Sequence, residues 1–390
     1  MVILRHDDLC QIIIHTANMI HSDWETMSDA VWRSPLLPLL PPTPSCTAIN
    51  QQTLLKEGSS SSPYGSGTRF KWDFLNYLRA YNKQRQITIP LIEQLLNYDF
   101  SSIIGALVAH VPGRHSLDPD NGTHFGWPAL RAVLKTIPVM PSPTAEVVCQ
   151  VSSIATLGPT PAWLLDKTLG PVLTSSCNNS APSKAKIGVV FPTAEEIRKS
   201  IGGYDSGGSI HARLQSAQQQ KQLRYMRPIY YHWAGDRPDT PENLEKVRLA
   251  GRKRAAPHIK TYVRYTDPNK PDETTIDWAL VTSANLSKQA WGDPVNKSGE
   301  IRVSSYELGV LVAPHMYSED AVMVPTFKTD KPDKNFEVDG AKKTTIGYRM
   351  PYDLPLVKYA ADEEPWCYYK THLEPDWRGA IHVYGPAPDS

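Results

Sequence analysis

The chain has 390 residues, and 41 basic against 40 acidic side chains leave a net charge of +1. Such a balance gives no general attraction to nucleic acid, so a basic binding surface would have to be local. The length allows two or three domains with a large core. The five cysteines lack C-x-x-C spacing, which argues against a disulfide framework or a zinc site and favours reduced thiols inside a cell. No apolar run approaches the ~20 residues of a membrane span, and charges within 5–8 interrupt any signal peptide.

Two apolar strands are expected at the start, over 1–4 and 9–14. The second leads into His15-Thr16-Ala17 and then Asn18. A strand-end Asn commonly caps the turn that follows, and the residues alone favour this interpretation of Asn18. The same form, a strand followed by small residues, an Asn and then a Trp, returns over 278–291, as expected of a fold with two similar halves.

The next region changes from a loop composition to helical spacing. Residues 36–67 are rich in Pro, Ser and Gly, which is typical of a flexible loop. Aromatic and aliphatic residues recur at helical spacing over 70–81, which predicts a core helix rather than a stripe that stacks bases. A short helix is expected over 91–96, a buried strand over 103–111, and a helix over 128–134 with Pro in its first turn.

A strand expected over 147–157 breaks into a small polar loop. Ser153 and Thr156 in this loop could bind a phosphate backbone through hydroxyl and main-chain groups. An ordinary Ser-rich turn is the alternative, and the residues alone favour it.

Further elements are expected between this loop and the middle of the chain. A strand over 188–191 precedes a helix over 193–200 that opens with a capping box. The Gly-rich loop over 202–208, closed by Ser209, lacks the Gly-Lys-Ser/Thr of a P-loop. A long Gln-rich helix is predicted over 211–225.

The segment AAPHIKTYVRY alternates β-branched and aromatic residues with polar ones, which predicts a strand. Strand period places His258 and Lys260 on one face, so an imidazole and an ammonium group point into the same space. An H-x-K pair by itself occurs by chance in many proteins.

Two further strands supply polar groups that could join this pair. A mostly buried strand over 278–282 ends at S-A-N, which contains Asn285, and an apolar strand over 306–313 has Glu307 near its start. Side by side, these strand ends could gather the His, Lys, Asn and Glu side chains at one edge of a sheet.

This set of side chains suits a phosphodiester. A Lys neutralises the non-bridging oxygens as charge builds up, and an Asn amide donates to them without adding charge. A His can attack phosphorus or carry the proton of the leaving group, because it titrates near neutrality. A carboxylate behind the imidazole would fix its tautomer.

The segments HIKTY, LVTSANLSKQAWG and SYELGVLV resemble, in order and spacing, the second catalytic motif of the tyrosyl-DNA phosphodiesterase family. This family is a branch of the phospholipase D superfamily, and it has Asn, as at Asn285, where the superfamily has Asp. IIIHTANMIHSDW and MPYDLP resemble the same family, so the resemblance covers nearly the whole chain. It implies an α/β fold of two similar halves with mixed sheets flanked by helices: 1–114 as the remnant of the first half and 115–390 as the second.

The resemblance also implies roles for individual residues. His258 would protonate the leaving tyrosyl oxygen and then activate water, while Lys260, Asn285 and Asn18 would hold the non-bridging oxygens. The reaction implied is hydrolysis of a 3′-phosphotyrosyl DNA end through a phosphohistidine, without a cofactor. No Asp, Glu and His cluster with metal-ligand spacing is present in the sequence.

Contacts with DNA are implied for a second set of residues, namely Ser153, Thr156, Ser209, Ser287 and Lys288. The expected partners are DNA with blocked 3′ ends, single- or double-stranded, and the tyrosyl peptide that a trapped topoisomerase leaves behind. A monomer in the nucleus, with no membrane partner, is expected.

One departure from the family limits these expectations. Glu307 would orient the family's nucleophilic histidine, and Asp29 would orient His258 at a position where the family often has an amide. The family's first H-x-K lies just upstream of a segment like 1–14, but here Met1 stands where residues after that motif are expected. The chain is therefore expected to be a piece of the enzyme with impaired activity.

Two alternatives stay open. A chain that keeps His258 and Lys260 without the nucleophile could be a DNA-end-binding protein that does not turn over. A phospholipase-type phosphodiesterase is the other, although Asn285 in place of Asp counts against it.

Overall fold

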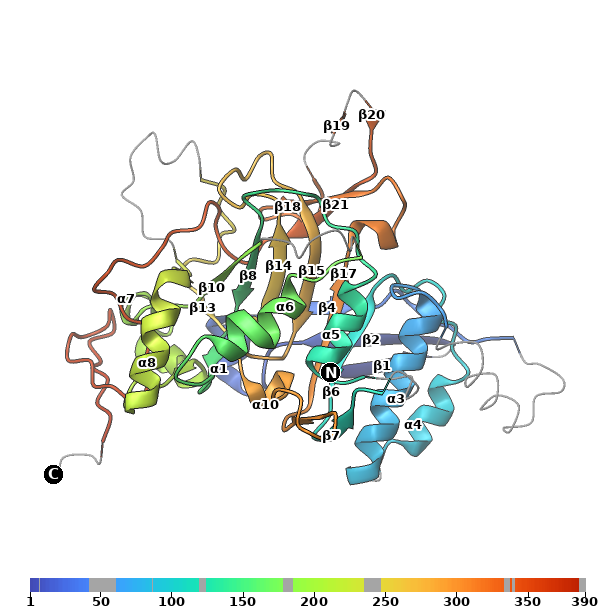
Figure 1. Ribbon diagram of the computed structural model, residues 1–390, viewed down its shortest axis with the longest axis horizontal. Helices are drawn as coiled ribbons and strands as arrows, with labels where there is room; N and C mark the ends of the chain where they lie inside the picture. The colour runs from blue at the N-terminus through green and yellow to red at the C-terminus, as the bar shows by residue number, and fades with distance from the viewer. Residues whose placement is uncertain are drawn as a thin grey trace.

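The computed structural model describes residues 1–6, 8–41, 61–85, 87–118, 124–177, 185–234, 247–332, 337–338 and 341–385. A nine-stranded mixed sheet stands at its centre, with the strand order β12-β10-β8-β14-β15-β17-β6; β18 pairs with β15, and β21 with β18 (Figure 1). Its strands are β6 (Ala106–His110), β8 (Glu146–Gln150), β10 (Lys186–Val190), β12 (Tyr230–Tyr231), β14 (Thr261–Tyr265), β15 (Ile276–Thr282), β17 (Glu307–Val312), β18 (Val322–Thr326) and β21 (Thr345–Arg349).

The remaining strands form smaller sheets. One sheet has four strands: β1 (Val2–His6), β2 (Leu9–His15), β4 (Val31–Arg33) and β5 (Leu37–Pro38). Four pairs complete the set: β3 (Met27–Ser28) with β13 (Ala256–Pro257), β7 (Gly113–Ser116) with β16 (Glu300–Val303), β9 (Ser153–Ile154) with β11 (His211–Ala212), and β19 (Glu337–Val338) with β20 (Ala341–Lys342).

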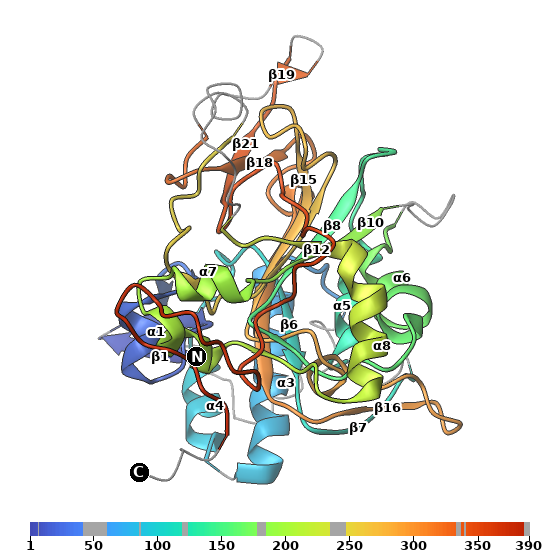
Figure 2. The same ribbon diagram turned by 90° about the vertical axis from the view of Figure 1, so that its left-hand side faces the viewer.

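Helices lie on both sides of the central sheet (Figures 1 and 2). The α-helices are α1 (His21–Glu25), α3 (Gly67–Arg85), α4 (Ile89–Leu95), α5 (Trp127–Leu134), α6 (Leu169–Leu173), α7 (Ala194–Arg198), α8 (Ala217–Met226) and α10 (Lys288–Trp291). Shorter or irregular helical segments are Ala162–Lys167, Gly203–Ser209, Arg227–Ile229 and Pro314–Met316.

Both faces of the central strands are buried, as alternate residues show. On β8, Val147 packs in the core that α5 and α6 share, while Val148 packs in the opposite core with Val263 of β14. A third core joins α3 and α4 to β2, β6 and β17. In the sequence, a strand that is buried on both faces is a continuous run of apolar residues, because none of its side chains faces water. Each fully buried Val contributes roughly 1.5–3 kcal/mol.

Several expected elements are present. The helix predicted over 70–81 is α3, and its Phe70 and Phe74 are 1% and 0% exposed, which confirms that this face packs in the core. The expected strands correspond to β1, β2, β6, β8, β10, β15 and β17 with small shifts at their ends. Because β6 pairs with β17, the central sheet contains strands from both sides of residue 114. The expected division of the chain into two halves at this residue stays a prediction. Most of the loop expected over 36–67 lies outside the described residues.

Two expectations were wrong in detail. The helix predicted from 211 begins at Ala217, because Ser216 and Gln219 form a capping box there, and His211 belongs to β11 instead. The Gly-rich loop is a 3-10 helix over Gly203–Ser209.

This 3-10 helix packs tightly against the C-terminal part of the chain. At Gly207, an added Cβ would lie 2.3 Å from the Trp366 ring, so only Gly allows the approach. The Trp366 indole N–H donates to the carbonyl groups of Gly207 and Ile210. Trp366 is fully buried and closes the edge of the core at this point.

Candidate active site

Four strand ends meet at one edge of the central sheet. β14 begins where its antiparallel neighbours β8 and β15 end, and β17 begins beside the end of β15. The pairing of β13 with β3 brings the segment after β2 to the same place, where the His258 N–H donates to the Ser28 carbonyl at 3.0 Å. Residues separated by more than 200 positions therefore surround one point, as the sheet order requires.

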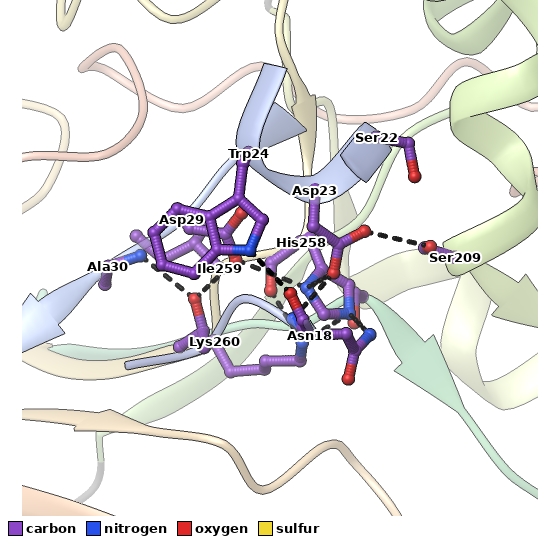
Figure 3. Close-up of polar contacts among 12 residues, drawn as sticks. Asn18, Ser22, Asp23, Trp24, Asp29, Ala30, Ser209, His258, Ile259 and Lys260 are labelled. Carbon is purple, nitrogen blue, oxygen red and sulfur yellow. Dashed lines mark hydrogen bonds and ion pairs between the residues drawn. The ribbon is translucent and has the colours of Figure 1, made fainter. Parts of the chain in front are cut away.

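His258 and Lys260 form the buried centre of this edge (Figure 3). They are 5% and 3% exposed and lie just before β14, so the regular strand begins at Thr261 rather than at His258. The Lys260 Nζ atom lies 3.0 Å from His258 Nε2 and donates to the His258 carbonyl at 2.6 Å. The two side chains share one space, as the strand period predicts.

Two carboxylates lie on the other side of the imidazole. His258 Nδ1 is 3.1 Å from Asp23 Oδ2 and 3.2 Å from Asp29 Oδ1, while the Asn18 amide nitrogen is 3.3 Å from Nε2. An ammonium group can only donate, so Nε2 must accept from Lys260, and the ring proton sits on Nδ1 facing the carboxylates. In the neutral form of the ring, the Nε2 lone pair is therefore directed at Lys260 and the Nδ1–H at the carboxylates.

Asp23 was not predicted from the sequence. It is 2% exposed on α1, and its Oδ2 also accepts from the Asn18 N–H at 2.8 Å, while Oδ1 accepts from the Ser209 hydroxyl at 3.2 Å. An acid five residues after Asn18 gives only a weak signal, because acids are also common in the first turn of helices.

Glu307, the first residue of β17, lies at the same sheet edge and interacts electrostatically with Lys260. Its Oε2 accepts from the Ser283 hydroxyl at 2.6 Å. Burial raises the pKa of Glu307, while the Ser283 hydrogen bond and the charge of Lys260 oppose this effect. Burial lowers the pKa of Lys260 to about 8, and the carboxylates of Asp29, Glu307 and Asp23 oppose the shift.

Asn285 is oriented by the polar loop after β8. Its Oδ1 accepts from the main-chain N–H groups of Ser152 and Ser153 at 3.1 and 2.8 Å, and it lies 3.2 Å from the Ser152 hydroxyl. With the oxygen occupied in this way, the NH₂ group points away from the loop and keeps its two donors.

The other expected DNA contacts have different surroundings. Ser287 accepts from the Ala290 N–H at 3.0 Å and caps α10, whose first residue is the half-buried Lys288. Ser209 contacts Asp23, and Ser153 contacts Asn285. Thr156 is exposed, and within the described ranges its side chain makes no hydrogen bond to these groups.

The described part of the chain contains neither a cluster suited to a metal ion nor a helix suited to a membrane span. Among the residues that the structure describes, no group of three or more His, Cys, Asp or Glu side chains is arranged to hold a metal ion. None of the described helices combines the length and apolar character that crossing a bilayer requires.

Known proteins are similar to this chain in sequence and in fold. The family model for tyrosyl-DNA phosphodiesterase matches residues 1–360. A probable tyrosyl-DNA phosphodiesterase of Schizosaccharomyces pombe is 31% identical over 439 residues, which cover 98% of this chain and 76% of that protein. Tyrosyl-DNA phosphodiesterase 1 of Drosophila melanogaster is 30% identical over 92% of this chain, and the match spans 54% of the insect protein.

The solved structure of the yeast tyrosyl-DNA phosphodiesterase aligns with a TM-score of 0.62 over 94% of this chain and 75% of that chain, at 19% identity. This likeness establishes the fold alone, an arrangement of mixed sheets flanked by helices. With a family model across more than nine-tenths of its length, the chain belongs to the tyrosyl-DNA phosphodiesterase family.

Proposed function

We propose that the protein hydrolyses 3′-phosphotyrosyl and related 3′-end adducts of DNA during repair in the nucleus. The observation that carries this proposal is the buried contact of 3.0 Å between His258 and Lys260, with Asn285 and Glu307 at the same sheet edge. The relatives whose names refer to tyrosyl-DNA support the choice of substrate.

Lys260, Asn285 and Asn18 bind the non-bridging oxygens in this proposal. A phosphate that approaches Lys260 competes with Nε2 for the ammonium group, because both bind the same donors. The charge of Lys260 then neutralises the phosphate, and the Asn amides add donors without charge. Binding therefore frees Nε2 of His258 for proton transfer.

His258 moves the proton at Nε2. Once the phosphate has replaced it as the partner of Lys260, Nε2 takes up a proton from solvent. In the first step a nucleophilic histidine forms an N–P bond, the bond from phosphorus to the tyrosyl oxygen breaks, and His258 gives the Nε2 proton to that oxygen. In the second step His258 takes a proton from water as the water oxygen attacks phosphorus and the N–P bond breaks. The products are tyrosine and a 3′-phosphate end. Asp23 and Asp29 orient the ring and stabilise its positive charge.

The nucleophilic histidine is not assigned to a residue of this chain. His258 and Lys260 form the one H-x-K motif in the 390 residues, so no second copy of the motif supplies it. We therefore expect these 390 residues alone to bind blocked ends more readily than they cleave them.

A gel assay on a single-stranded oligonucleotide with a 3′-phosphotyrosine tests the proposal, with and without EDTA, beside His258→Ala. Slow turnover or binding without turnover is expected, with the turnover lost in the variant. Turnover that His258→Ala leaves unchanged would overturn the role of His258. A folded protein that neither binds nor cleaves this oligonucleotide would overturn the substrate.

A further inference from the structure

The short segment over 209–211 forms hydrogen bonds with residues of the candidate site at both of its ends. At one end the Ser209 hydroxyl donates to Asp23 Oδ1 at 3.2 Å, and the other oxygen of Asp23 lies 3.1 Å from His258 (Figure 3). At the other end the His211 N–H donates to the Ser152 carbonyl at 3.0 Å. Ser152 in turn donates to Asn285, so the segment spans from the His258 group to the Asn285 group.

The backbone conformation directs the His211 side chain toward the candidate site. Ile210 is extended, with φ −119° and ψ 122°, and its side chain is fully buried in the core. Neighbours of a residue in extended backbone point to the opposite face, so Ser209 and His211 share the face on which Ser209 reaches Asp23. The bonds from Trp366 to the backbone of this segment hold it in place.

His211 has a buried ring nitrogen without a partner. Its Nδ1 makes no hydrogen bond to any of the described residues, although the side chain is half-buried. An unpartnered buried N–H costs free energy, so a neutral ring carries its proton on Nε2 instead. Burial, and then the charges of Arg213 and His258, lower the pKa of His211. Near neutral pH the ring is therefore a neutral donor close to His258.

An aromatic side chain lies beside this ring. The Tyr368 and His211 rings meet edge to face, with centroids 6.0 Å apart and an interplanar angle of 75°. Tyr368 also contacts the ring of Tyr369. The surface beside His211 therefore offers an aromatic wall next to a hydrogen-bond donor, a combination that suits an aryl group with a polar substituent.

We propose that His211 is a further active-site residue that contacts the leaving group of the substrate, donating from Nε2 to the adduct while Tyr368 packs against its aryl ring. This inference rests on the proposed function, in which His258 protonates the leaving oxygen. His211 belongs to the segment that joins the His258 and Asn285 groups, and the aromatic wall of Tyr368 beside it suits an aryl leaving group rather than the DNA backbone.

Binding measurements on two matched oligonucleotides test the placement. Fluorescence anisotropy gives the affinity for one oligonucleotide with a 3′-phosphotyrosine and one with a 3′-phosphate; where turnover is seen, kcat/KM replaces the affinity for the first. We expect His211→Ala to weaken binding of the phosphotyrosyl oligonucleotide about tenfold, as for loss of one hydrogen bond, and to leave the 3′-phosphate oligonucleotide unchanged. His211→Gln, whose amide nitrogen can replace Nε2, should recover most of the loss.

His315 offers a matched control. It is also half-buried, its Nδ1 also has no partner within the described residues, and burial lowers its pKa as well. It lies in the turn Pro314–Met316, near the start of β15, at the end of the strand opposite Asn285. His315→Ala should leave both affinities unchanged, while urea unfolding checks that all variants are folded.

The outcomes separate this inference from the proposed function. Failure of the wild-type chain to bind either oligonucleotide would overturn both. Wild-type binding that His211→Ala does not change, or an equal loss on both oligonucleotides, would overturn the leaving-group contact and leave the function in place. Imidazole NMR gives a readout without ligand: His258→Ala should raise the pKa of His211, and an unchanged pKa would contradict the shared site.

Discussion

Lys260 directs its ammonium group at Nε2 of His258, the atom that must carry the proton in the proposed reaction, at a distance of 3.0 Å. The same ammonium group is expected to bind the phosphate, so substrate binding and the release of Nε2 are one event. Because burial lowers the pKa of Lys260 to about 8, this event depends on pH within a measurable range.

The affinity for a 3′-phosphate oligonucleotide should fall as pH rises through about 8, because Lys260 loses its charge there. Well above that pH the loss approaches about tenfold per pH unit. Anisotropy titrations between pH 7 and 9.5 measure the profile. Lys260→Arg, which stays charged, should bind without this fall, and an equal fall in the Arg variant would show that another group titrates.

The free energy of unfolding should rise with pH over the range in which the affinity for the 3′-phosphate oligonucleotide falls. The folded pKa of Lys260 lies below its ordinary value of 10.5, so the unfolded chain binds more protons between about 8 and 10.5. The cost of burying the charge is fully present below pH 8 and is relieved as pH rises through this window. Urea unfolding of the wild type and Lys260→Arg should show the relief in the wild type alone; equal profiles would contradict the burial effect.

Asn285→Asp should fold and yet lose phosphate affinity. A carboxylate can accept the same main-chain N–H bonds from Ser152 and Ser153. It has no donor left for the phosphate and repels it, so we expect at least about a tenfold loss of affinity for a 3′-phosphate end. Unfolding curves serve as the control. Unchanged affinity would show that the NH₂ group of Asn285 does not face the substrate.

Replacing either carboxylate that faces His258 Nδ1 by an amide should have different effects: Asp23→Asn should destabilise the fold, and Asp29→Asn should not. Both oxygens of Asp23 accept hydrogen bonds, and Asn supplies one acceptor, so Asp23→Asn breaks a buried contact and should cost about 1–3 kcal/mol of unfolding free energy. In Asp29 only Oδ1 accepts, from Thr16, and faces His258; Oδ2 has no partner among the described residues.

Asp29→Asn should therefore unfold close to the wild type in urea. Its affinity for the phosphotyrosyl oligonucleotide should also be kept, whereas Asp23→Asn should lower it about tenfold. Equal behaviour of the two variants would contradict the distinction drawn from their hydrogen bonds.

A buried ion pair away from the site should affect stability and not binding. Arg264 Nε donates to Asp277 Oδ2 at 2.8 Å, and the side chains are 1% and 4% exposed. Arg264→Met leaves a buried carboxylate without its cation and should cost about 3–5 kcal/mol at neutral pH. Affinity per folded molecule should not change.

The loss in Arg264→Met should shrink in acid. Burial raises the pKa of Asp277 even with Arg264 present, so the folded state takes up a proton before the unfolded chain does. Stability therefore improves as pH falls toward the ordinary value of 3.8, and it improves more in Arg264→Met, because Arg264 no longer lowers the pKa of Asp277 there. Urea midpoints at pH 8 and 5 measure this, and an equal loss at both pH values would contradict it. The double variant with Asp277→Asn should recover much of the loss.

The sequence by itself determined the parts of the protein that depend on local order. Period-2 alternation placed His258 and Lys260 on one side, because successive side chains of extended backbone point to opposite faces. The helix α3 and the buried strands were predictable from apolar spacing, and the resemblance of three ordered segments identified the family that the comparisons establish.

The tertiary structure alone decided which distant groups meet and where regular elements stop. Asp23 faces His258 because β13 pairs with β3, and no local pattern encodes that pairing across more than 200 residues. His211 was assigned to a helix because helix-forming residues follow it, but the capping box at Ser216 starts the helix later and leaves His211 to pair with Ser153. Long-range pairing and burial, which depend on the whole sheet, thus set the composition of the site.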